Sequence, residues 1–526
     1  MHKTTVIQRA LISVTDKTGI VALGQALHKK GIEILSTGGT AQELRNHQIP
    51  VIDISQYTQF PEMMDGRLKT LHPKIYGGIL GRRDTDINVM AQHDIQDIDL
   101  VVVNLYRFQE AISQDNVVLS DAIEKIDIGG PALIRAAAKN FSWCTVVTDV
   151  NDYAAIIEEL QTHNGIQEMT RFMLAKKAFQ HTAQYDGQIS NYLSKLDHPD
   201  NSAAYFGQTL NSQYTLKQVL RYGENPHQQA AFYQNQTTSN LSCFAQTKQL
   251  QGKALSYNNI LDGEAALKCI RRFEHPSCVI VKHTNPCGVA QAEDLSRAYT
   301  KAYQCDPQSA FGGIIAFNRT VDAPLMETIL SQQFVEVMIA PEFEPAALEL
   351  AKNKPNCRLM QYKQEQASSQ LSEQNWETKS VEGGILVQTP AAQQNIELEV
   401  VTTIQPTENQ LSDLRFAWQV IQSVKSNAIV LAKNLQSIGI GAGQSSRVFS
   451  IKIAQMRAAQ AELSLQGAVL ASDAFFPFQD NVELAHTLGI SAIIQPGGSK
   501  RDPEIIQCAN DLGICMVFTH IRQFSH

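Results

Sequence analysis

Residues 10–40 read ALISVTDKTGIVALGQALHKKGIEILSTGGT, and this stretch decides the fold class. The apolar run 10–14 predicts a strand, the amphipathic run 20–30 predicts a helix that Gly31 ends, and 32–36 predicts the next strand. Two strands separated by a helix indicate a parallel sheet covered by helices. The fold class is therefore α/β.

The following residues continue this alternation and then lose it. The segment LDHPDNSAAYFGQTLNS, residues 196–212, has no periodicity and is rich in Pro, Asn, Ser and Gly, which predicts a domain boundary. We expect a domain over 1–149, a helical connector over 150–200 and a second α/β domain over 201–526. The further elements expected in the first two parts are a helix at 40–47, strands at 51–54, 100–105 and 145–148, and helices at 130–139, 152–162 and 170–194.

Composition narrows the class of function. The chain has 526 residues and a formal net charge of −8, which opposes a binder of duplex nucleic acid because a polyphosphate selects a basic face. No apolar run reaches the length of a membrane span, and the first residues turn polar too soon for a signal peptide. Nine cysteines without any C-x-x-C favour reduced thiols in the cytoplasm and oppose a zinc site, so we expect no bound metal.

A glycine-rich turn follows the strand at 32–36. Ser36, Gly38, Gly39 and Thr40 lie between a strand and a helix, where free backbone N–H groups and the helix dipole favour a phosphate. A simple tight turn with a helix cap is the alternative. The turn at 13–19 ends the neighbouring strand and so lies at the same sheet edge, which favours the phosphate site.

Several polar residues farther along are ambiguous when taken singly. Residues 60–73, FPEMMDGRLKTLHP, form a loop that presents Arg67, Lys69 and His72, and a solvated basic loop would look the same. Tyr106 follows the strand at 100–105. Asp127 and Lys139 flank a predicted helix, and each could be a cap or a surface charge.

The second domain contains a weak internal repeat. Two segments share one pattern, in which an apolar strand is followed by a lysine, a turn and a glycine. They are residues 278–288, CVIVKHTNPCG, and residues 428–439, AIVLAKNLQSIG. Two related subdomains that meet at a cleft would give this pattern. Buried strands in general resemble one another, so both interpretations stay open.

Lys282 and His283 carry the chemistry of the first of these segments. Side chains of adjacent strand residues point to opposite faces, so the two share a site only if the chain leaves the strand there, and the following Asn-Pro favours such an exit. Otherwise one is buried and the other solvated. A histidine base beside a lysine cation suits acyl transfer to an amine, because the cation stabilises the tetrahedral oxyanion.

Long motifs extend these observations to a family. SVTDKTG, LSTGGTA, FPEMMDGRLKTLHPKIYGGIL, NLY, IDIGGPALIRAAAKN and KHTNPCG resemble the bifunctional purine biosynthesis family of bacteria, almost from end to end. The resemblance implies AICAR transformylase and IMP cyclohydrolase activities, with 10-formyltetrahydrofolate as co-substrate and a cytoplasmic homodimer whose transformylase site is built from both protomers. It implies a methylglyoxal-synthase-like doubly wound parallel sheet, then two cytidine-deaminase-like α/β subdomains that lack the deaminase metal. No nucleic-acid or membrane partner is implied.

The resemblance also assigns residues to the two reactions. It places Lys69, Tyr106, Asp127 and Lys139 at the reacting end of the cyclohydrolase, and leaves open which of them carries the proton. Its ribose-phosphate contacts are Lys17, Ser36, Gly38, Gly39, Thr40, Arg67 and Thr70. For the transformylase it implies His283 as base, Lys282 as electrostatic catalyst and Asn427 as hydrogen-bond partner. Its other transformylase contacts are Arg221, Tyr222, Phe311, Gly312, Glu336, Arg447, Phe475, Asp480, Asn481, Arg522 and His526.

Two departures and two rival functions remain. Gln479 stands where the family pattern has Arg, and Arg107 stands where it has Pro. A nucleotide-sensing module without catalysis would have lost the catalytic groups, which this chain keeps. A methylglyoxal-synthase-like lyase would account for the first domain alone and leaves KHTNPCG unexplained.

Overall fold

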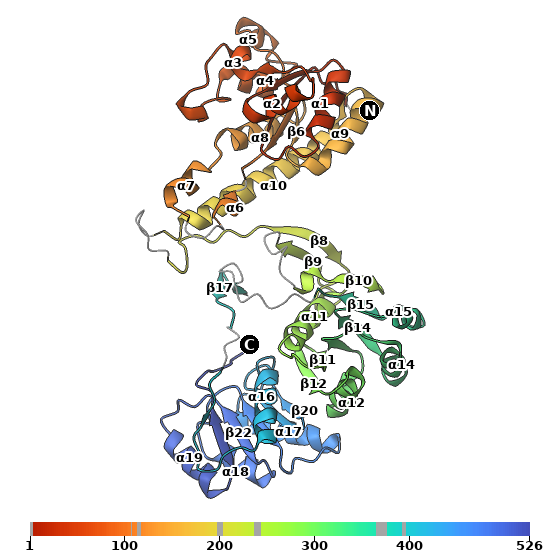
Figure 1. Ribbon diagram of the computed structural model, residues 1–526, viewed down its shortest axis with the longest axis vertical. Helices are drawn as coiled ribbons and strands as arrows, with labels where there is room; N and C mark the ends of the chain where they lie inside the picture. The colour runs from red at the N-terminus through yellow and green to blue at the C-terminus, as the bar shows by residue number, and fades with distance from the viewer. Residues whose placement is uncertain are drawn as a thin grey trace. The chain divides into compact units, whose positions relative to one another are not determined.

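The computed structural model divides the chain into two compact units, Met1–Gln213 and Tyr214–His526, which we call unit 1 and unit 2 (Figure 1). Each is described by itself. None of the described helices is both long and apolar enough to cross a membrane. The structure describes residues 4–106, 108–112, 117–196, 204–235, 243–363, 376–391 and 396–526.

Unit 1 is built on a five-stranded sheet with the order β4-β3-β2-β5-β6, and every neighbouring pair is parallel. Side chains alternate between its faces, so Leu11 joins one core and Ala10 and Ile12 join the other. Its elements are β1 Thr4–Thr5, β2 Arg9–Val14, α1 Ile20–Lys29, β3 Glu33–Ser36, α2 Gly38–Asn46, β4 Ile52–Asp53, α3 Ile54–Thr58, η1 Met64–Gly66, α4 Pro73–Leu80, α5 Ile87–Gln92, β5 Leu100–Asn104, α6 Phe108–Ile112, α7 Leu119–Glu124, α8 Gly129–Lys139, β6 Thr145–Val147, η2 Val150–Asp152, α9 Tyr153–His163, β7 Ile166–Gln167 and α10 Glu168–Leu193.

Helices cover both faces of this sheet. Helices α1, α2 and α9 supply side chains to the core on one face, and α4, α8 and α10 supply the other. The described part of the expected connector, residues 150–196, therefore belongs to unit 1, because the apolar sides of α9 and α10 complete these two cores. Residues 197–200 lie outside the described part of the chain.

Unit 2 is built on a twelve-stranded mixed sheet, and two short antiparallel hairpins, β8-β9 and β16-β17, accompany it. Its elements are β8 Tyr214–Leu220, β9 Ala230–Asn235, η4 Phe244–Gln246, β10 Lys248–Gln251, α11 Tyr257–Ile270, β11 Ser277–Lys282, β12 Asn285–Gln291, α12 Leu295–Cys305, α13 Pro307–Ala310, β13 Gly313–Phe317, α14 Ala323–Gln332, β14 Val335–Ala340, α15 Pro345–Ala351, β15 Arg358–Gln361, β16 Glu377–Val381, β17 Gly384–Gln388, β18 Glu399–Val400, α16 Glu408–Ile421, β19 Ile429–Lys433, β20 Gln436–Gly441, α17 Arg447–Gln460, β21 Val469–Ser472, α18 Asp480–Thr487, β22 Ala492–Gln495, α19 Asp502–Asp511 and β23 Cys515–Phe518.

The twelve strands form two copies of one arrangement. Their order is β10-β15-β14-β13-β11-β12 and then β20-β19-β21-β22-β23-β18, so the second six mirror the first. We call the first six strands and their helices copy 1 and the second six copy 2. The copies meet where β12 pairs with β20 in antiparallel fashion, through Ala290 and Gln436. The internal repeat suggested by the sequence is thus present in the fold.

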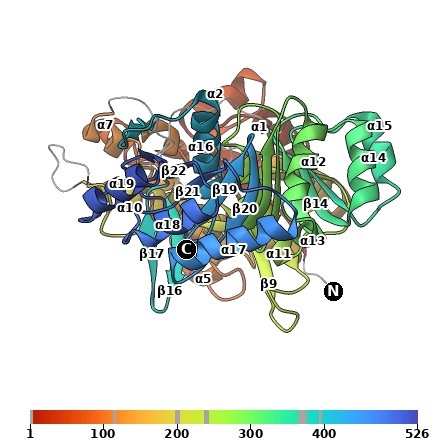
Figure 2. The ribbon, with the colours of Figure 1, turned by 90° about the horizontal axis from the view of Figure 1, so that it is seen from below.

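Each copy contributes helices to both faces of the sheet. Helices α11 and α16 share one continuous core, which spans both copies. On the opposite face, α12, α14 and α15 cover copy 1, and α17, α18 and α19 cover copy 2. In Figure 2, α14 and α15 lie toward one end of this sheet, and α18 and α19 lie toward the other.

Candidate active sites

The predicted phosphate site of unit 1 lies at the carboxyl edge of its parallel sheet. The turns after β2 and β3 and the segment after β5 all leave this edge, where open α/β sheets bind ligands. Asn104, the last residue of β5, fixes the turn after β2. Its side-chain oxygen accepts hydrogen bonds from the N–H groups of Thr15, at 2.6 Å, and Asp16, at 3.0 Å.

Lys17 brings a cation to the N-terminus of α2. A Cβ atom on Gly39 would stand 3.1 Å from the Lys17 ammonium nitrogen. Because glycine has no side chain, the ammonium group can lie close to the backbone here. An ammonium beside the first N–H groups of a helix suits a phosphate. The hydroxyls of Ser36 and Thr40 instead donate to the carbonyls of Ile12 and Val14, at 2.7 and 3.0 Å.

Ser36 and Thr40 are therefore buried residues that tie the turn to β2. Since both hydroxyls donate to the strand, Ser36 and Thr40 do not offer them to a phosphate, and the backbone N–H groups beside Gly38 and Gly39 remain for that contact. The sequence predicts phosphate contacts from Ser36, Gly38, Gly39 and Thr40 and does not distinguish side chain from backbone. The structure favours the backbone.

Asp127 forms the centre of a second group at the N-terminus of α8. Its carboxylate accepts a hydrogen bond from the N–H of Gly130 at 2.8 Å, and its own N–H donates to the Tyr185 hydroxyl at 2.7 Å. Burial raises the pKa of Asp127, although hydrogen bonds from the amides of Gly130 and Tyr106 oppose the shift. Burial, with a smaller contribution from the Asp127 charge, raises the pKa of Tyr76 to about 12.

The loop at 60–73 adjoins this group. Thr70 is buried, and its hydroxyl would stand 2.9 Å from a Cβ atom on Gly129, the first residue of α8. Lys69 pairs with Glu62 at 2.7 Å, and Arg67 pairs with Glu124. Lys69 and Arg67 thus each form an ion pair and are not simply solvated cations. His72 accepts a hydrogen bond from the N–H of Lys74 and caps α4.

Lys139 does not join the Asp127 group. It is exposed and is the last residue of α8, roughly 15 Å along the helix axis from Gly129 at 1.5 Å per residue. The expectation that Lys139 stands with Lys69, Tyr106 and Asp127 at one reacting end is therefore not met within a single chain. Tyr106 is 52% exposed just after β5, and the departure at Arg107 lies outside the described residues.

In unit 2, Lys282 and His283 occupy the tip of the hairpin β11-β12. Lys282 pairs with Asn285 across the strands, which leaves His283 and Thr284 as a two-residue turn with φ of +52° and +60°. Two-residue hairpin turns with positive φ at both positions normally contain Asn and Gly. Such backbone costs about 1–3 kcal/mol at a residue with a side chain, so other contacts must hold it.

Asp262 on α11 supplies those contacts. Its two carboxylate oxygens accept hydrogen bonds from the N–H groups of His283 and Thr284, at 3.2 and 2.7 Å. The chain thus leaves the strand after Lys282, next to the Asn285-Pro286 that favours such an exit. The turn itself is His283–Thr284, and Asn285 and Pro286 already belong to β12.

Lys282 is half-buried beside the segment that precedes β13. Its ammonium donates a hydrogen bond to the carbonyl of Phe311, and the N–H of Gly312 donates to the carbonyl of Phe334 at 2.8 Å. His283 is exposed. The predicted residues Lys282, Phe311 and Gly312 are therefore brought together, with the His283 imidazole at the adjoining tip.

The same construction recurs in copy 2 with different side chains. Asn434 and Leu435 form the turn of the hairpin β19-β20 with φ of +54° and +56°. Their N–H groups donate to the carboxylate of Asp413 on α16, at 2.9 and 2.7 Å. Lys433 donates to the carbonyl of Gln466 at 2.7 Å, as Lys282 does to Phe311.

Asn427 reaches the edge of the His283 hairpin from the start of β19. Because β11, β12, β20 and β19 are successively antiparallel, the end of β11 and the start of β19 lie at one sheet edge. Asn285 accepts a hydrogen bond from the N–H of Lys425 at 2.9 Å, which links the two segments. Two strands separate β11 from β19, so their backbones stand about 14 Å apart.

Arg447 lies at the same edge and is engaged by a buried acid. It donates to Asp473, which is fully buried, at 3.0 Å, and Asp473 also accepts from the Ser426 hydroxyl at 2.5 Å. Among the described atoms, the Nε of Arg447 is buried without a hydrogen-bond partner. A buried unpaired donor costs free energy that an anionic ligand would recover. The guanidinium also stacks on Phe524, 5.7 Å from the ring centroid.

The remaining predicted transformylase residues fall into two kinds. Some are engaged by neighbours: Glu336 pairs with Arg358 at 2.7 Å, the Arg221 guanidinium stacks on Tyr222 with 4.8 Å to the ring centroid, and Asn481 donates to Asp480 at 2.8 Å. Near the end of the chain, Phe475 is 37% exposed, Arg522 stacks on Phe524 and the carbonyl of His526 accepts from Lys425 at 2.8 Å. The departure at Gln479 donates to the carbonyl of Glu504 at 3.2 Å.

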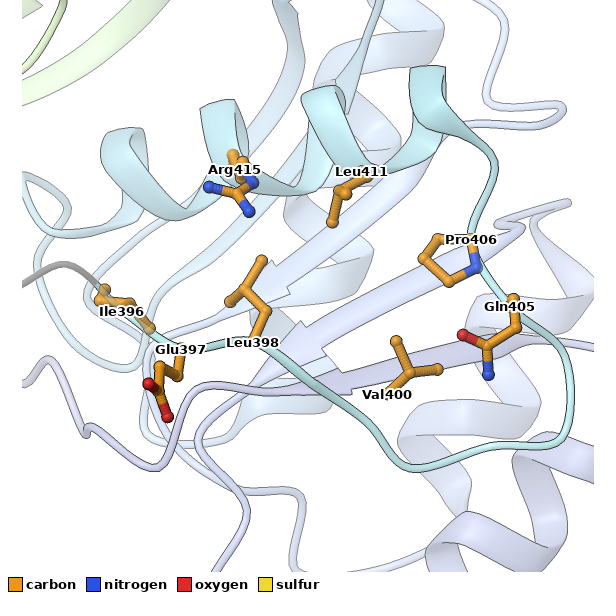
Figure 3. A pocket seen from close by; sticks show the side chains of 8 residues that line it. All are labelled: Ile396, Glu397, Leu398, Val400, Gln405, Pro406, Leu411 and Arg415. Atoms are coloured by element: carbon orange, nitrogen blue, oxygen red, sulfur yellow. The ribbon is translucent and has the colours of Figure 1, made fainter.

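Of two cavities among the described residues of unit 2, the smaller one adjoins the predicted chemistry. A cavity of about 650 Å³ is lined by α16 and by the extended segment that leads through β18. Figure 3 shows Leu411 and Arg415 on α16 pointing toward that segment, and no predicted site residue lines this cavity. The other cavity, of about 490 Å³, is lined by Phe311 and Phe334, beside the carbonyl that binds Lys282.

Comparison with known families decides the identity. The AICARFT/IMPCHase bienzyme family matches residues 137–457, more than half of the chain, and the MGS-like domain matches residues 19–132. The chain belongs to the AICARFT/IMPCHase bienzyme family. The crystal structure of ForH shares 33% identity over 35% of this chain and 97% of its own, with a TM-score of 0.32 that carries no argument about the fold.

The bienzyme catalyses the last two steps of IMP synthesis, formyl transfer to AICAR and the ring closure that follows. Its substrates are small molecules, and a formyltransferase of this family implies a formyl-folate co-substrate. Its α/β architecture agrees with the sequence-based expectation of a methylglyoxal-synthase-like unit followed by the transformylase region.

Sequence reasoning missed four groups that the bienzyme uses to build these edges. Asp262 holds the His283 turn, Asp473 holds Arg447, Asn104 holds the turn after β2, and Tyr185 binds the N–H of Asp127. A signal for Asp262 did exist, because Asp413 stands at the same distance before Lys433 as Asp262 before Lys282. Tyr185 and Asp473 reach their partners across the fold, and no local pattern marks them.

Proposed function

We propose that each reaction has its own site, with ring closure in unit 1 and formyl transfer in unit 2. Ring closure joins the carboxamide nitrogen to the formyl carbon and expels water, so it needs a base and a donor for the developing oxyanion. Asp127, with a pKa raised by burial, and the neighbouring Tyr106 are suited to this work. Lys69 supplies the cation, and Lys17 with the N-terminus of α2 holds the ribose phosphate.

In unit 2, we assign formyl transfer to His283 and Lys282. The imidazole takes a proton from the amine of AICAR as the amine attacks the formyl carbon, and the Lys282 ammonium stabilises the tetrahedral oxyanion. The proton then passes to the leaving nitrogen of tetrahydrofolate. The observation that carries this assignment is the hairpin tip, which takes His283 out of the strand and leaves Lys282 beside Phe311 and Gly312.

Three finer points belong to this proposal. The formyl donor is 10-formyltetrahydrofolate, and Phe475, Asp480 and Asn481 serve its pterin side. The enzyme acts as a cytoplasmic homodimer. The roughly 14 Å between the strands of His283 and Asn427 in one chain supports a transformylase site that both protomers complete.

Two variants assayed on both reactions test the division. Purified protein is given AICAR and 10-formyltetrahydrofolate, tetrahydrofolate and IMP are followed separately, and formyl-AICAR is supplied in a second assay. His283→Ala should abolish tetrahydrofolate release and leave cyclisation of formyl-AICAR intact. Asp127→Asn should do the reverse. A folded variant that loses both activities would contradict the two-site assignment.

The raised pKa of Asp127 predicts how cyclohydrolase activity falls at low pH, which is the acid limb of its pH profile. If the ionised carboxylate acts, protonation stops the reaction, so cyclohydrolase activity should fall as the pH drops through a pKa above the usual carboxyl value of about 3.9. Raising the pH above that value restores the carboxylate. Asp127→Asn should remove this limb from the residual activity, and the pH profile of kcat on formyl-AICAR measures it.

A further inference from the structure

The two copies in unit 2 hold the tip of their hairpin with the same hydrogen-bonding arrangement. In each, a carboxylate on the covering helix holds both N–H groups of a two-residue turn: Asp262 holds His283 and Thr284, and Asp413 holds Asn434 and Leu435. Both turns keep positive φ without glycine. A threonine at +60° is strongly disfavoured, since its branched side chain crowds the backbone.

The remaining geometry of the two hairpins also agrees. Each has a register shift at the same place, directly after the pair Ile280–Gly288 in copy 1 and directly after the pair Leu431–Gly439 in copy 2. Each lysine donates to the carbonyl before a glycine, Gly312 or Gly467, with φ of +70° or +75°. The side chains at the turn are the main difference, so copy 2 is a natural control for copy 1.

We propose that Asp262 is a positioning residue for formyl transfer. Its carboxylate holds the His283–Thr284 turn in the left-handed conformation, and this sets where the His283 imidazole stands relative to the Lys282 ammonium and the Phe311–Gly312 segment. The proposal rests on the assignment of His283 and Lys282 as catalytic residues. Asp413 does the same for a turn that carries no reacting group, so its carboxylate serves the fold alone.

The physical reason is that the carboxylate offers a separate oxygen to each of the two N–H groups, whereas an asparagine in the same position has one oxygen and one NH₂ group. In Asp262→Asn the amide oxygen accepts from one backbone N–H, and the NH₂ group, itself a donor, faces the other N–H, which loses its acceptor. The turn then relaxes toward negative φ, and the imidazole moves with it. A displacement of about 1 Å of a catalytic group costs on the order of 100-fold in rate.

The test compares matched variants of the full-length protein. Asp262→Asn should lower kcat for formyl transfer about 100-fold with KM for AICAR nearly unchanged, and cyclisation of formyl-AICAR should stay at the wild-type rate. Asp413→Asn makes the same change at the turn of copy 2, where one of the two N–H groups loses its acceptor, and should leave kcat for formyl transfer unchanged. Thermal unfolding of both variants shows whether their losses of stability are comparable.

A second variant separates positioning from a general loss of structure. Glycine adopts positive φ without cost, so Asp262→Asn combined with Thr284→Gly should recover part of the lost kcat. Equal losses of kcat in Asp262→Asn and Asp413→Asn, or no recovery with Thr284→Gly, would overturn the proposal. His283→Ala is run alongside. If it keeps full formyl transfer, the catalytic assignment fails, whereas an inactive His283→Ala beside a fully active Asp262→Asn refutes the positioning role alone.

Discussion

Copy 1 and copy 2 of unit 2 have the same hairpin, the same aspartate and the same lysine, yet the proposed base and cation of formyl transfer belong to copy 1. Copy 1 ends its hairpin in His283–Thr284 and copy 2 in Asn434–Leu435. The antiparallel pairing of β12 with β20 also places the two tips at opposite edges of the sheet. The comparison teaches that the repeat fixes the backbone of the hairpin. Whether a hairpin can take part in a reaction depends on the side chains of its turn and on the residues that surround it.

The largest effect should come from making the two tips alike. His283→Asn gives copy 1 the residue that copy 2 carries at this position, so the hairpin should fold as before. Loss of the base should reduce formyl transfer about 100- to 10,000-fold. Asn434→His, the reciprocal change, should leave it at the wild-type rate. Tetrahydrofolate release measures both, and a gain of activity from Asn434→His in the His283→Asn background would break the comparison.

The second largest effect should come from replacing Lys282, whereas replacing its counterpart Lys433 should not change the rate of formyl transfer. Lys282→Met and Lys433→Met each remove one hydrogen bond to a backbone carbonyl, so similar small losses of stability are expected. Only Lys282→Met should slow formyl transfer, by about 100-fold, since a donor to the oxyanion is lost. Single-turnover kinetics with saturating AICAR measures this step. Comparable slowing in both variants would show that the contact to the carbonyl, and not the charge at the site, matters.

The matching glycines should affect stability in both copies alike. A Cβ atom on Gly288 would stand 1.9 Å from the carbonyl oxygen of Ala302 on α12, and one on Gly439 would stand 2.2 Å from that of Ala454 on α17. Each glycine lets its strand approach a helix closely. Gly288→Ala and Gly439→Ala should each cost about 1–3 kcal/mol of unfolding free energy. Denaturant unfolding measures this cost. A variant whose unfolding free energy is unchanged would show that the close strand–helix packing is absent from its copy.

Much of the fold could be predicted from the sequence. In unit 1 the strand at 32–36 became Glu33–Ser36 and the helix at 20–30 became Ile20–Lys29, because side-chain periodicity is local. The helices expected as a connector instead complete the cores of unit 1. Which face a helix covers depends on contacts with strands far away in the chain, and periodicity alone does not contain them.

The candidate sites were less predictable than the elements that carry them. Motifs placed Asp127 and Lys139 in one reacting group, yet α8 separates them by its whole length. The sequence predicts that Ser36 and Thr40 contact a phosphate, but in the structure they flank the turn and their hydroxyls bind β2. The sequence shows which residue types are present and how they are spaced. It does not show which of two hydrogen-bonding partners a hydroxyl takes.

The sequence by itself determined the α/β elements, the family motifs and the repeated lysine-turn-glycine pattern, since these depend on residue type and short spacing. Only the tertiary structure decided that the turn is His283–Thr284, that Asp262 holds it and that Asn427 shares its edge. These facts depend on the direction in which strands pair and on contacts between residues distant in the chain. Such long-range contacts fix the positions of the proposed catalytic groups, because a strand alone would turn Lys282 and His283 to opposite faces.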